Sequence, residues 1–328
     1  MKMRNGSIEA FRCLCMFGIV FLHAVTWSPF VVRGMDNVGN VGVVGFVMVS
    51  AFFGIQFKPS KIVRLLTVAV ASSIAAYATI MAFSGDCSGG GFCTTVWQFT
   101  CSCWYVWAYL FLMLVSPLVD TCLEKVGKDR KSLSHLLICS GFLLWVWNYS
   151  ATVSHFKWVP TTVGFDELSG VTLVGVYACA RLMFALRVGG GGWLLAALSG
   201  CLVYAGFRHS AGIVAFVFAW SVFGLFLKFR LPEWMNKTFR WLGGSMFAVY
   251  MIHAQMTELF FECERGMFES WGLSYNWCHL IMATAAFFGC VVIDLPRRFV
   301  AHLFKRPLKA GCALVDDGYY RLVARLAG

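Results

Sequence analysis

Two ionisable residues interrupt the first apolar stretch of the chain: Arg12 and His23, in the run NGSIEAFRCLCMFGIVFLH. Eleven residues of α-helix make about three full turns and rise about 16 Å, so both side chains lie on one face. A guanidinium binds phosphates, and an imidazole transfers protons near neutral pH. Ionisable groups inside membrane spans usually face a bundle interior or a cavity. The spacing therefore predicts a polar path along one face of this helix.

A second histidine of the same kind, His253, lies in the apolar run GGSMFAVYMIHAQ. It follows Arg240 by about 20 Å of helix, and His23 follows Glu9 by a similar length, which predicts similar depths for the two imidazoles. Tyr250 shares the helix face of His253. The sequence does not say whether the two helices touch. Each histidine can be a proton-transfer group or a buried ring that bonds a backbone carbonyl.

Basic residues gather where the second apolar stretch ends, in the run KPSKIVR. Pro59 breaks the helix, and Lys61 and Arg64 share a face of the next one. With Lys58 they can hold phosphates. The same cluster is typical of anionic-lipid binding or of topology control, and Arg12 can equally be an arginine that reaches the inner headgroups. The residues leave these alternatives open.

An aromatic group opens the fourth apolar stretch, at Trp104, Tyr105 and Tyr109. A substrate-binding surface and an interfacial aromatic belt both explain it. Most of the fourteen cysteines lie inside apolar stretches, where cysteine behaves as a small apolar residue. Cys87 and Cys93 flank a glycine-rich loop and could form a disulfide on an oxidising side of a membrane. We expect no metal site, because no cysteine spacing is completed by histidine or acidic ligands.

The composition predicts an all-α, polytopic membrane protein. The 328 residues are 59% hydrophobic and 13% charged, with a mean hydropathy of +0.72, whereas soluble domains carry about 25% charged residues. A span needs about 20 apolar residues, and on that basis we predict about ten transmembrane helices, at residues 8–26, 41–57, 62–83, 104–121, 134–150, 170–187, 193–207, 211–228, 240–260 and 277–294.

The distribution of positive charge predicts the orientation. With the N-terminus in the cytoplasm, inner segments hold 22 Lys and Arg residues and outer loops hold 4, as the positive-inside rule requires. Both termini are then cytoplasmic. We divide the chain into a transmembrane bundle, residues 1–296, and a basic amphipathic tail, residues 297–328, on the inner leaflet. The basic residues fall in short loops, so membrane lipid is a better partner for them than nucleic acid.

Five motifs in this order resemble the acyltransferase type-3 family. They are the opening helix with Arg12 and His23, the run FVMVSAFF around Ser50, the KPSKIVR loop, the run WYVWAY that ends in a Ser-Pro pair, and the YMIH run at Tyr250. Ala51 stands where the family usually has glycine. The resemblance covers the chain from Asn5 to about Pro296.

The resemblance implies an integral membrane enzyme that moves an acyl group, usually acetyl, from cytoplasmic acyl-CoA to a hydroxyl of a cell-surface glycan or its lipid-linked precursor. It also implies a bacterial inner membrane. Under it, His23 is the general base, and His253 and Arg12 are the other catalytic residues. Arg12 and the basic cluster Lys58, Lys61 and Arg64 then bind CoA. The substrate-binding residues are Ser50, Trp104, Tyr105, Tyr109 and Tyr250.

Different functions remain compatible with the same residues. A proton-coupled transporter or flippase of a glycan or lipid could use Arg12, His23 and His253 as a relay, although the chain lacks the internal repeat that many transporters have. An inactive acyl-CoA or lipid sensor is a third reading. No serine or cysteine has an adjacent base in the sequence, which favours direct transfer over a covalent acyl-enzyme without deciding between them. Oligomeric state cannot be read from the sequence.

Overall fold

The computed structural model describes residues 5–26, 36–84, 91–126, 129–154, 170–189, 192–204, 211–270 and 275–327. These ranges contain thirteen helices and no strand, which confirms the predicted all-α class. The helices are α1 (Gly6–Thr26), α2 (Asp36–Phe53), α3 (Pro59–Ser84), α4 (Phe92–Ser102), α5 (Trp104–Val126), α6 (Arg130–Ser154), α7 (Gly170–Ala185), α8 (Trp193–Tyr204), α9 (Ala211–Lys228), α10 (Glu233–Gly243), α11 (Met246–Ser270), α12 (Tyr275–Leu303) and α13 (Lys305–Ala327).

Nine of the ten predicted spans each overlap one helix, whereas the span predicted at 240–260 begins in the last residues of α10 and lies mostly in α11. Four helical stretches are long and apolar enough to cross a membrane, Gly6–Ala24, Pro59–Phe83, Trp104–Val126 and Trp277–Leu303, and four shorter helices are also apolar. The number of spans and the side of the termini stay predictions. The structure adds α4 and α10, which the hydropathy pattern missed because each has only 11 residues, too short to span a bilayer.

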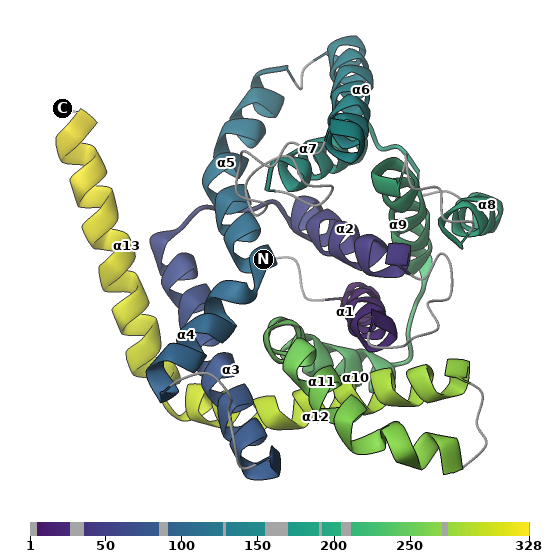
Figure 1. Cartoon of the computed structure of the whole chain (residues 1–328). Helices are drawn as coiled ribbons and strands as arrows, with labels where there is room; N and C mark the ends of the chain where they lie inside the picture. Colours follow the sequence, from purple (N-terminus) through teal and green to yellow (C-terminus); the bar gives the residue numbers. More distant parts are fainter. Residues whose placement is uncertain are drawn as a thin grey trace.

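Helix α1 lies at the centre of the arrangement (Figure 1). It packs against α2, α9, α10, α11 and α12. Its apolar core residues, such as Met16 and Val20, are completely buried. Helix α13 leaves the end of α12, runs beside α3, and carries the C-terminus away from the other helices (Figure 1). The helix with Arg12 and His23 is therefore enclosed by protein on several sides, as ionisable groups in a membrane require.

Glycines let α1 and α2 approach closely. A Cβ atom added to Gly42 would lie 2.5 Å from the carbonyl oxygen of Cys15, and one added to Gly45 would lie 2.4 Å from the Cys15 sulfur. Small residues permit this kind of helix contact in membrane proteins. The contact fixes the height of α1 against α2, and thereby of Arg12 against the side chains that α2 presents.

Local signals set the helix boundaries. Gly54 has φ +76°, a left-handed conformation that ends α2 just past Phe53. Pro59 begins α3, where its missing N–H is not needed. Asp129 caps α6 and accepts hydrogen bonds from the Ser132 hydroxyl and from the backbone N–H groups of Lys131 and Ser132. These bonds lower the pKa of Asp129, with the hydroxyl contributing most.

The possible disulfide lies partly outside the described residues. Cys87 is not among them, whereas Cys93 is exposed near the start of α4. The pairing therefore stays a prediction.

Replacing Gly42 by alanine should destabilise the protein by about 1–3 kcal/mol, because the new methyl group meets the α1 backbone, which cannot move aside without repacking. Gly141 is the matched control: it is also in a helix, and nothing lies within 4 Å of an added Cβ there. Gly141→Ala should be neutral or stabilise by up to about 1 kcal/mol. Thermal unfolding in detergent measures both, and equal effects would contradict the close packing of α1 on α2.

Candidate active site

The two predicted histidines meet. The rings of His23 on α1 and His253 on α11 have centroids 4.6 Å apart at an interplanar angle of 73°. His23 is half-buried, whereas His253 is almost completely buried behind it. The two helices pack against each other. His23 is therefore the more accessible ring of the pair, and His253 lies in contact with it.

Chemistry decides which nitrogen of His253 carries hydrogen. Its Nδ1 lies 2.6 Å from the carbonyl oxygen of Tyr250, and a carbonyl oxygen can only accept. Nδ1 must therefore donate, and in the neutral ring Nε2 then holds a free lone pair. Nε2 is buried and has no hydrogen-bond partner among the described residues. An unpartnered buried acceptor beside a second imidazole is suited to receive a hydrogen bond or a proton.

A row of tyrosines continues from the histidine pair. Tyr250 lies 5.5 Å from His253 and 5.2 Å from Tyr105 of α5, measured between ring centroids. The Tyr250 hydroxyl accepts a hydrogen bond of 3.3 Å from the backbone N–H of Tyr105. Tyr109 stacks on Tyr105 at 5.7 Å, and Trp104 packs edge-on against Tyr105 at 5.8 Å. Aromatic contacts of this geometry are attractive.

The row ends on α2 and returns to α1. The Ser50 hydroxyl lies 3.3 Å from the Tyr109 hydroxyl and donates to the carbonyl oxygen of Phe46 at 3.0 Å. The guanidinium of Arg12 lies over the Phe46 ring, 5.9 Å from its centroid, within the range of a cation–π contact. Eight predicted site residues thus form one connected set. It runs from His23 through His253, Tyr250, Tyr105 and Tyr109 to Ser50, with Trp104 beside Tyr105, and Phe46 links Ser50 to Arg12.

Arg12 has a partner that the sequence reading missed. Its Nη1 donates to Oε2 of Glu9 at 2.8 Å, and the Glu9 side chain is 4% exposed. Glu9 also abuts α10, since a Cβ added to Gly243 would lie 2.0 Å from Oε2. Breaking a buried ion pair is costly because it leaves one charge uncompensated. The i, i+3 spacing of an acid and a base was the signal that could have found this pair.

The remaining predicted cations lie at the start of another helix. Lys58, Lys61 and Arg64 are exposed at the start of α3, and the Lys61 ammonium donates to the backbone oxygen of Gln56 at 2.8 Å. The basic cluster is thus placed at the N-terminus of α3, separate from the ion pair of Arg12 on α1. A single ligand that used both groups would have to span between these two helices.

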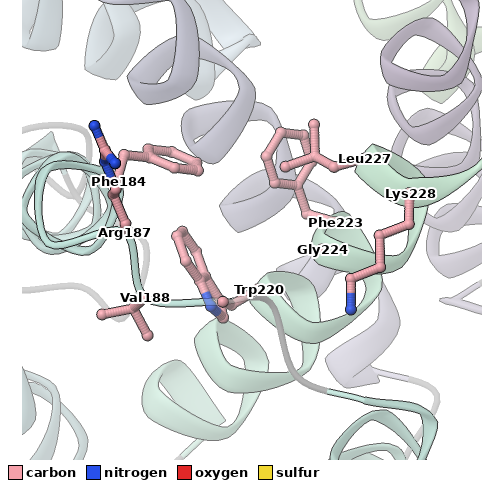
Figure 2. Close-up of a pocket in the computed structure, with 9 residues that line it drawn as sticks. Phe184, Arg187, Val188, Trp220, Phe223, Gly224, Leu227 and Lys228 are labelled. Carbon is pink, nitrogen blue, oxygen red and sulfur yellow. The ribbon is translucent and has the colours of Figure 1, made fainter.

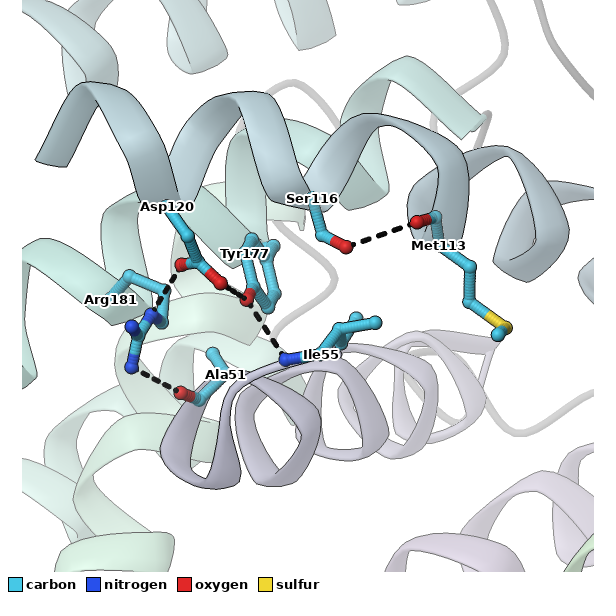
Figure 3. A network of polar contacts seen from close by, with 7 residues as sticks. All are labelled: Ala51, Ile55, Met113, Ser116, Asp120, Tyr177 and Arg181. Atoms are coloured by element: carbon cyan, nitrogen blue, oxygen red, sulfur yellow. Dashed lines mark hydrogen bonds and ion pairs between the residues drawn. The ribbon is translucent and has the colours of Figure 1, made fainter. Parts of the chain in front are cut away.

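A polar network that the sequence analysis did not single out ties α2, α5 and α7 together (Figure 3). Asp120 of α5 accepts from Arg181 Nε at 2.8 Å and from the Tyr177 hydroxyl at 2.9 Å. The Tyr177 hydroxyl accepts from the backbone N–H of Ile55 at 3.2 Å, and Arg181 donates to the Ala51 carbonyl at 3.3 Å. The sequence feature that could have revealed this network is Asp120 itself, an acidic residue near the end of the predicted span 104–121.

A small cavity of about 210 Å³ opens between the C-terminal ends of α7 and α9 (Figure 2). Phe184, Trp220 and Phe223 form its apolar wall, and Arg187 and Lys228 lie on opposite sides of it (Figure 2). Phe223 also packs edge-on against Phe11 of α1. A residue that lines the cavity therefore packs on α1, but none of the residues predicted for the site lines it.

The described geometry is that of a histidine pair joined to aromatic and hydroxyl side chains inside a bundle of apolar helices. Comparison with protein families finds that the family described as the acyltransferase domain matches residues 5–297. The chain belongs to the acyltransferase type-3 family. With its apolar helices, it is an integral membrane acyltransferase. No curated protein and no solved structure matches this acyltransferase significantly.

Replacing Asp120 by alanine should destabilise this acyltransferase by about 2–3 kcal/mol, because Arg181 loses its carboxylate and the Tyr177 hydroxyl loses its acceptor. Glu233→Ala is the matched control: its pair with Arg240 has an N–O distance of 3.4 Å and side chains that are 38% and 67% exposed, for which about 0–1 kcal/mol is expected. Thermal unfolding measures both variants. Equal losses would show that the Asp120 network does not hold α2 to α5 and α7.

Proposed function

We propose that the protein transfers an acyl group, acetyl in the simplest case, from cytoplasmic acyl-CoA to a hydroxyl of a cell-surface glycan or its lipid-linked precursor. We place it in a bacterial cytoplasmic membrane with both termini in the cytoplasm. The observation that carries the proposal is the contact between His23 and His253. Because His23 is the more exposed of the two rings, we assign it the role of general base.

In the proposed reaction, a lone-pair nitrogen of His23 takes the proton of the acceptor hydroxyl. The oxygen forms a bond to the thioester carbonyl carbon, and the carbon–sulfur bond breaks. The protonated imidazole returns its proton to the leaving thiolate, so that an ester and free CoA are the products. A positioned base contributes about 10²- to 10⁴-fold to such a step. No covalent acyl-enzyme is needed.

His253 is proposed to position His23. Its Nδ1 is engaged with the Tyr250 carbonyl, so its Nε2 is left as an acceptor with no partner among the described residues. A small rotation of the His23 ring would let one N–H of His23 donate to that nitrogen. The other nitrogen of His23 would then be fixed as the base, in the way that a third group orients the base of a catalytic triad. The backbone carbonyl of Tyr250 thus orients His253, which in turn orients His23.

The donor is proposed to bind at the other end of α1. Arg12, with the basic cluster of Lys58, Lys61 and Arg64, would hold the phosphates of CoA, which guanidinium and ammonium groups bind well. The pantetheine arm would then extend about 16 Å along α1 toward His23. Trp104, Tyr105, Tyr109, Tyr250 and Ser50 would line the substrate's path. The hydroxyl pair of Ser50 and Tyr109 offers hydrogen bonds to the thioester or to the acceptor.

Release of free CoA thiol by the purified protein, supplied with acetyl-CoA and candidate glycans, tests the proposal. His23→Ala should lower kcat by about 10²- to 10⁴-fold with little change in the Kd for CoA, because it removes the base and leaves the phosphate-binding residues in place. His253→Ala should lower kcat by about tenfold or more. His135→Ala, at an exposed histidine of α6, is the control and should retain activity.

A wild-type protein that moves a glycan or lipid across a membrane and leaves acyl-CoA intact would instead identify a transporter. Full activity of His23→Ala would remove that residue from the role of base.

Neutralising Arg12 should weaken CoA binding by about 10- to 100-fold, the loss expected for a hydrogen bond to a charged group. Arg12→Gln alone would leave the buried Glu9 carboxylate without this cation and would weaken the packing of α1 against α10. The double variant Glu9→Gln/Arg12→Gln avoids that charge imbalance. Isothermal titration with CoA should give a raised Kd in the double variant and an unchanged Kd in Glu9→Gln, provided the latter keeps its thermal stability. An unchanged Kd in both would place the donor elsewhere.

A further inference from the structure

A carboxylate of α13 is bound at the N-terminus of α3. Asp316 accepts two hydrogen bonds from Ser60: the backbone N–H donates to Oδ1 at 2.9 Å, and the hydroxyl donates to Oδ2 at 2.7 Å. Ser60 lies in the first turn of α3 and is buried. The first N–H groups of a helix have no partner within it, and the helix dipole makes this end positive. The start of α3 is therefore an anion site that the chain's own carboxylate fills.

The charges around this contact fit an anion site. The hydrogen bonds from Ser60 lower the pKa of Asp316 most, and Lys58 and Lys61 lower it further. A lowered carboxyl pKa keeps Asp316 ionised from mildly acidic pH upward, so the contact persists throughout the physiological range. A helix N-terminus with a serine hydroxyl and two lysines also has the donors that bind phosphate groups in proteins.

The rest of α13 is attached loosely. The Tyr319 ring packs edge-on against Phe57, with centroids 5.7 Å apart. Most other side chains of α13 are exposed, and the helix projects past the remaining helices at its C-terminal end (Figure 1). Two hydrogen bonds and one ring contact therefore carry much of the docking. A stronger anion at the same donors can displace α13 at small cost.

We propose that Asp316 and a phosphate group of acyl-CoA compete for the start of α3, so that α13 is an inhibitory latch that the donor must open. The inference rests on the proposed function and adds to it two elements: Ser60 as a phosphate-binding residue and Asp316 as its displaceable occupant. If only a fraction of molecules has the site open, the apparent Kd for the donor rises by the inverse of that fraction. Two part-buried charge-assisted bonds at the protein surface correspond to about three- to tenfold.

The test is isothermal titration of the full-length protein with CoA. Asp316→Asn should lower the Kd for CoA by about three- to tenfold, because the amide binds the two donors less well. Asp317→Asn removes the same charge from the next, exposed residue, and should leave the Kd almost unchanged. Tyr319→Ala loosens α13 without changing any charge, and should also lower the Kd. Together the three variants separate the release of a latch from a general loss of negative charge.

A second readout follows α13 directly. In the wild-type protein, CoA should speed tryptic cleavage at the basic residues of α13, and in Asp316→Asn cleavage should be fast with or without CoA. An unchanged or raised Kd in both Asp316→Asn and Tyr319→Ala, when the wild type binds CoA, would overturn the latch and leave the proposed function standing. If no form of the protein binds CoA, the proposed function fails and the latch fails with it.

Discussion

The structure depends on the enclosure of one helix. Helix α1 carries a glutamate–arginine ion pair near its start and a histidine three turns later, and neither belongs in hydrocarbon. Five other helices pack around it. Glycines of α2 bring that helix against the α1 backbone, and Gly243 of α10 leaves room for Glu9. The close packing and the polar groups require each other, since a loosened α1 would expose Arg12 and separate His23 from His253.

The enclosed polar and aromatic side chains form a connected row. From Arg12 a connected set of side chains runs over Phe46 and Ser50 of α2, through the tyrosines of α5, to Tyr250 and the two histidines. The Arg12 guanidinium and the His23 imidazole thus lie at separate ends of one helix. This separation suits a reaction in which a charged donor and a hydroxyl acceptor approach from opposite faces of a membrane, because neither has to pass the other.

Much of this arrangement could be predicted from the sequence, whereas the contacts between different helices could not. Hydropathy located ten helices, and three-residue and eleven-residue spacings placed Arg12, His23, Tyr250 and His253 on common faces. Periodicity describes one helix at a time, so it could not pair His23 with His253, nor Asp120 with Arg181 across α5 and α7. Nor could it show that Asp316 of α13 binds Ser60 at the start of α3, because the two residues lie far apart along the chain.

The most direct test of the account is photo-crosslinking with an acyl-CoA analogue that carries a diazirine in its acyl chain, followed by mass spectrometry of the labelled peptides. If the thioester is delivered along α1, adducts should concentrate on α1, α5 and α11 near His23, Tyr105 and Tyr250, and excess acetyl-CoA should suppress them. Competable adducts confined to α7 and α9, around the cavity at Trp220, would place the acyl group away from the histidine pair and contradict the central claim.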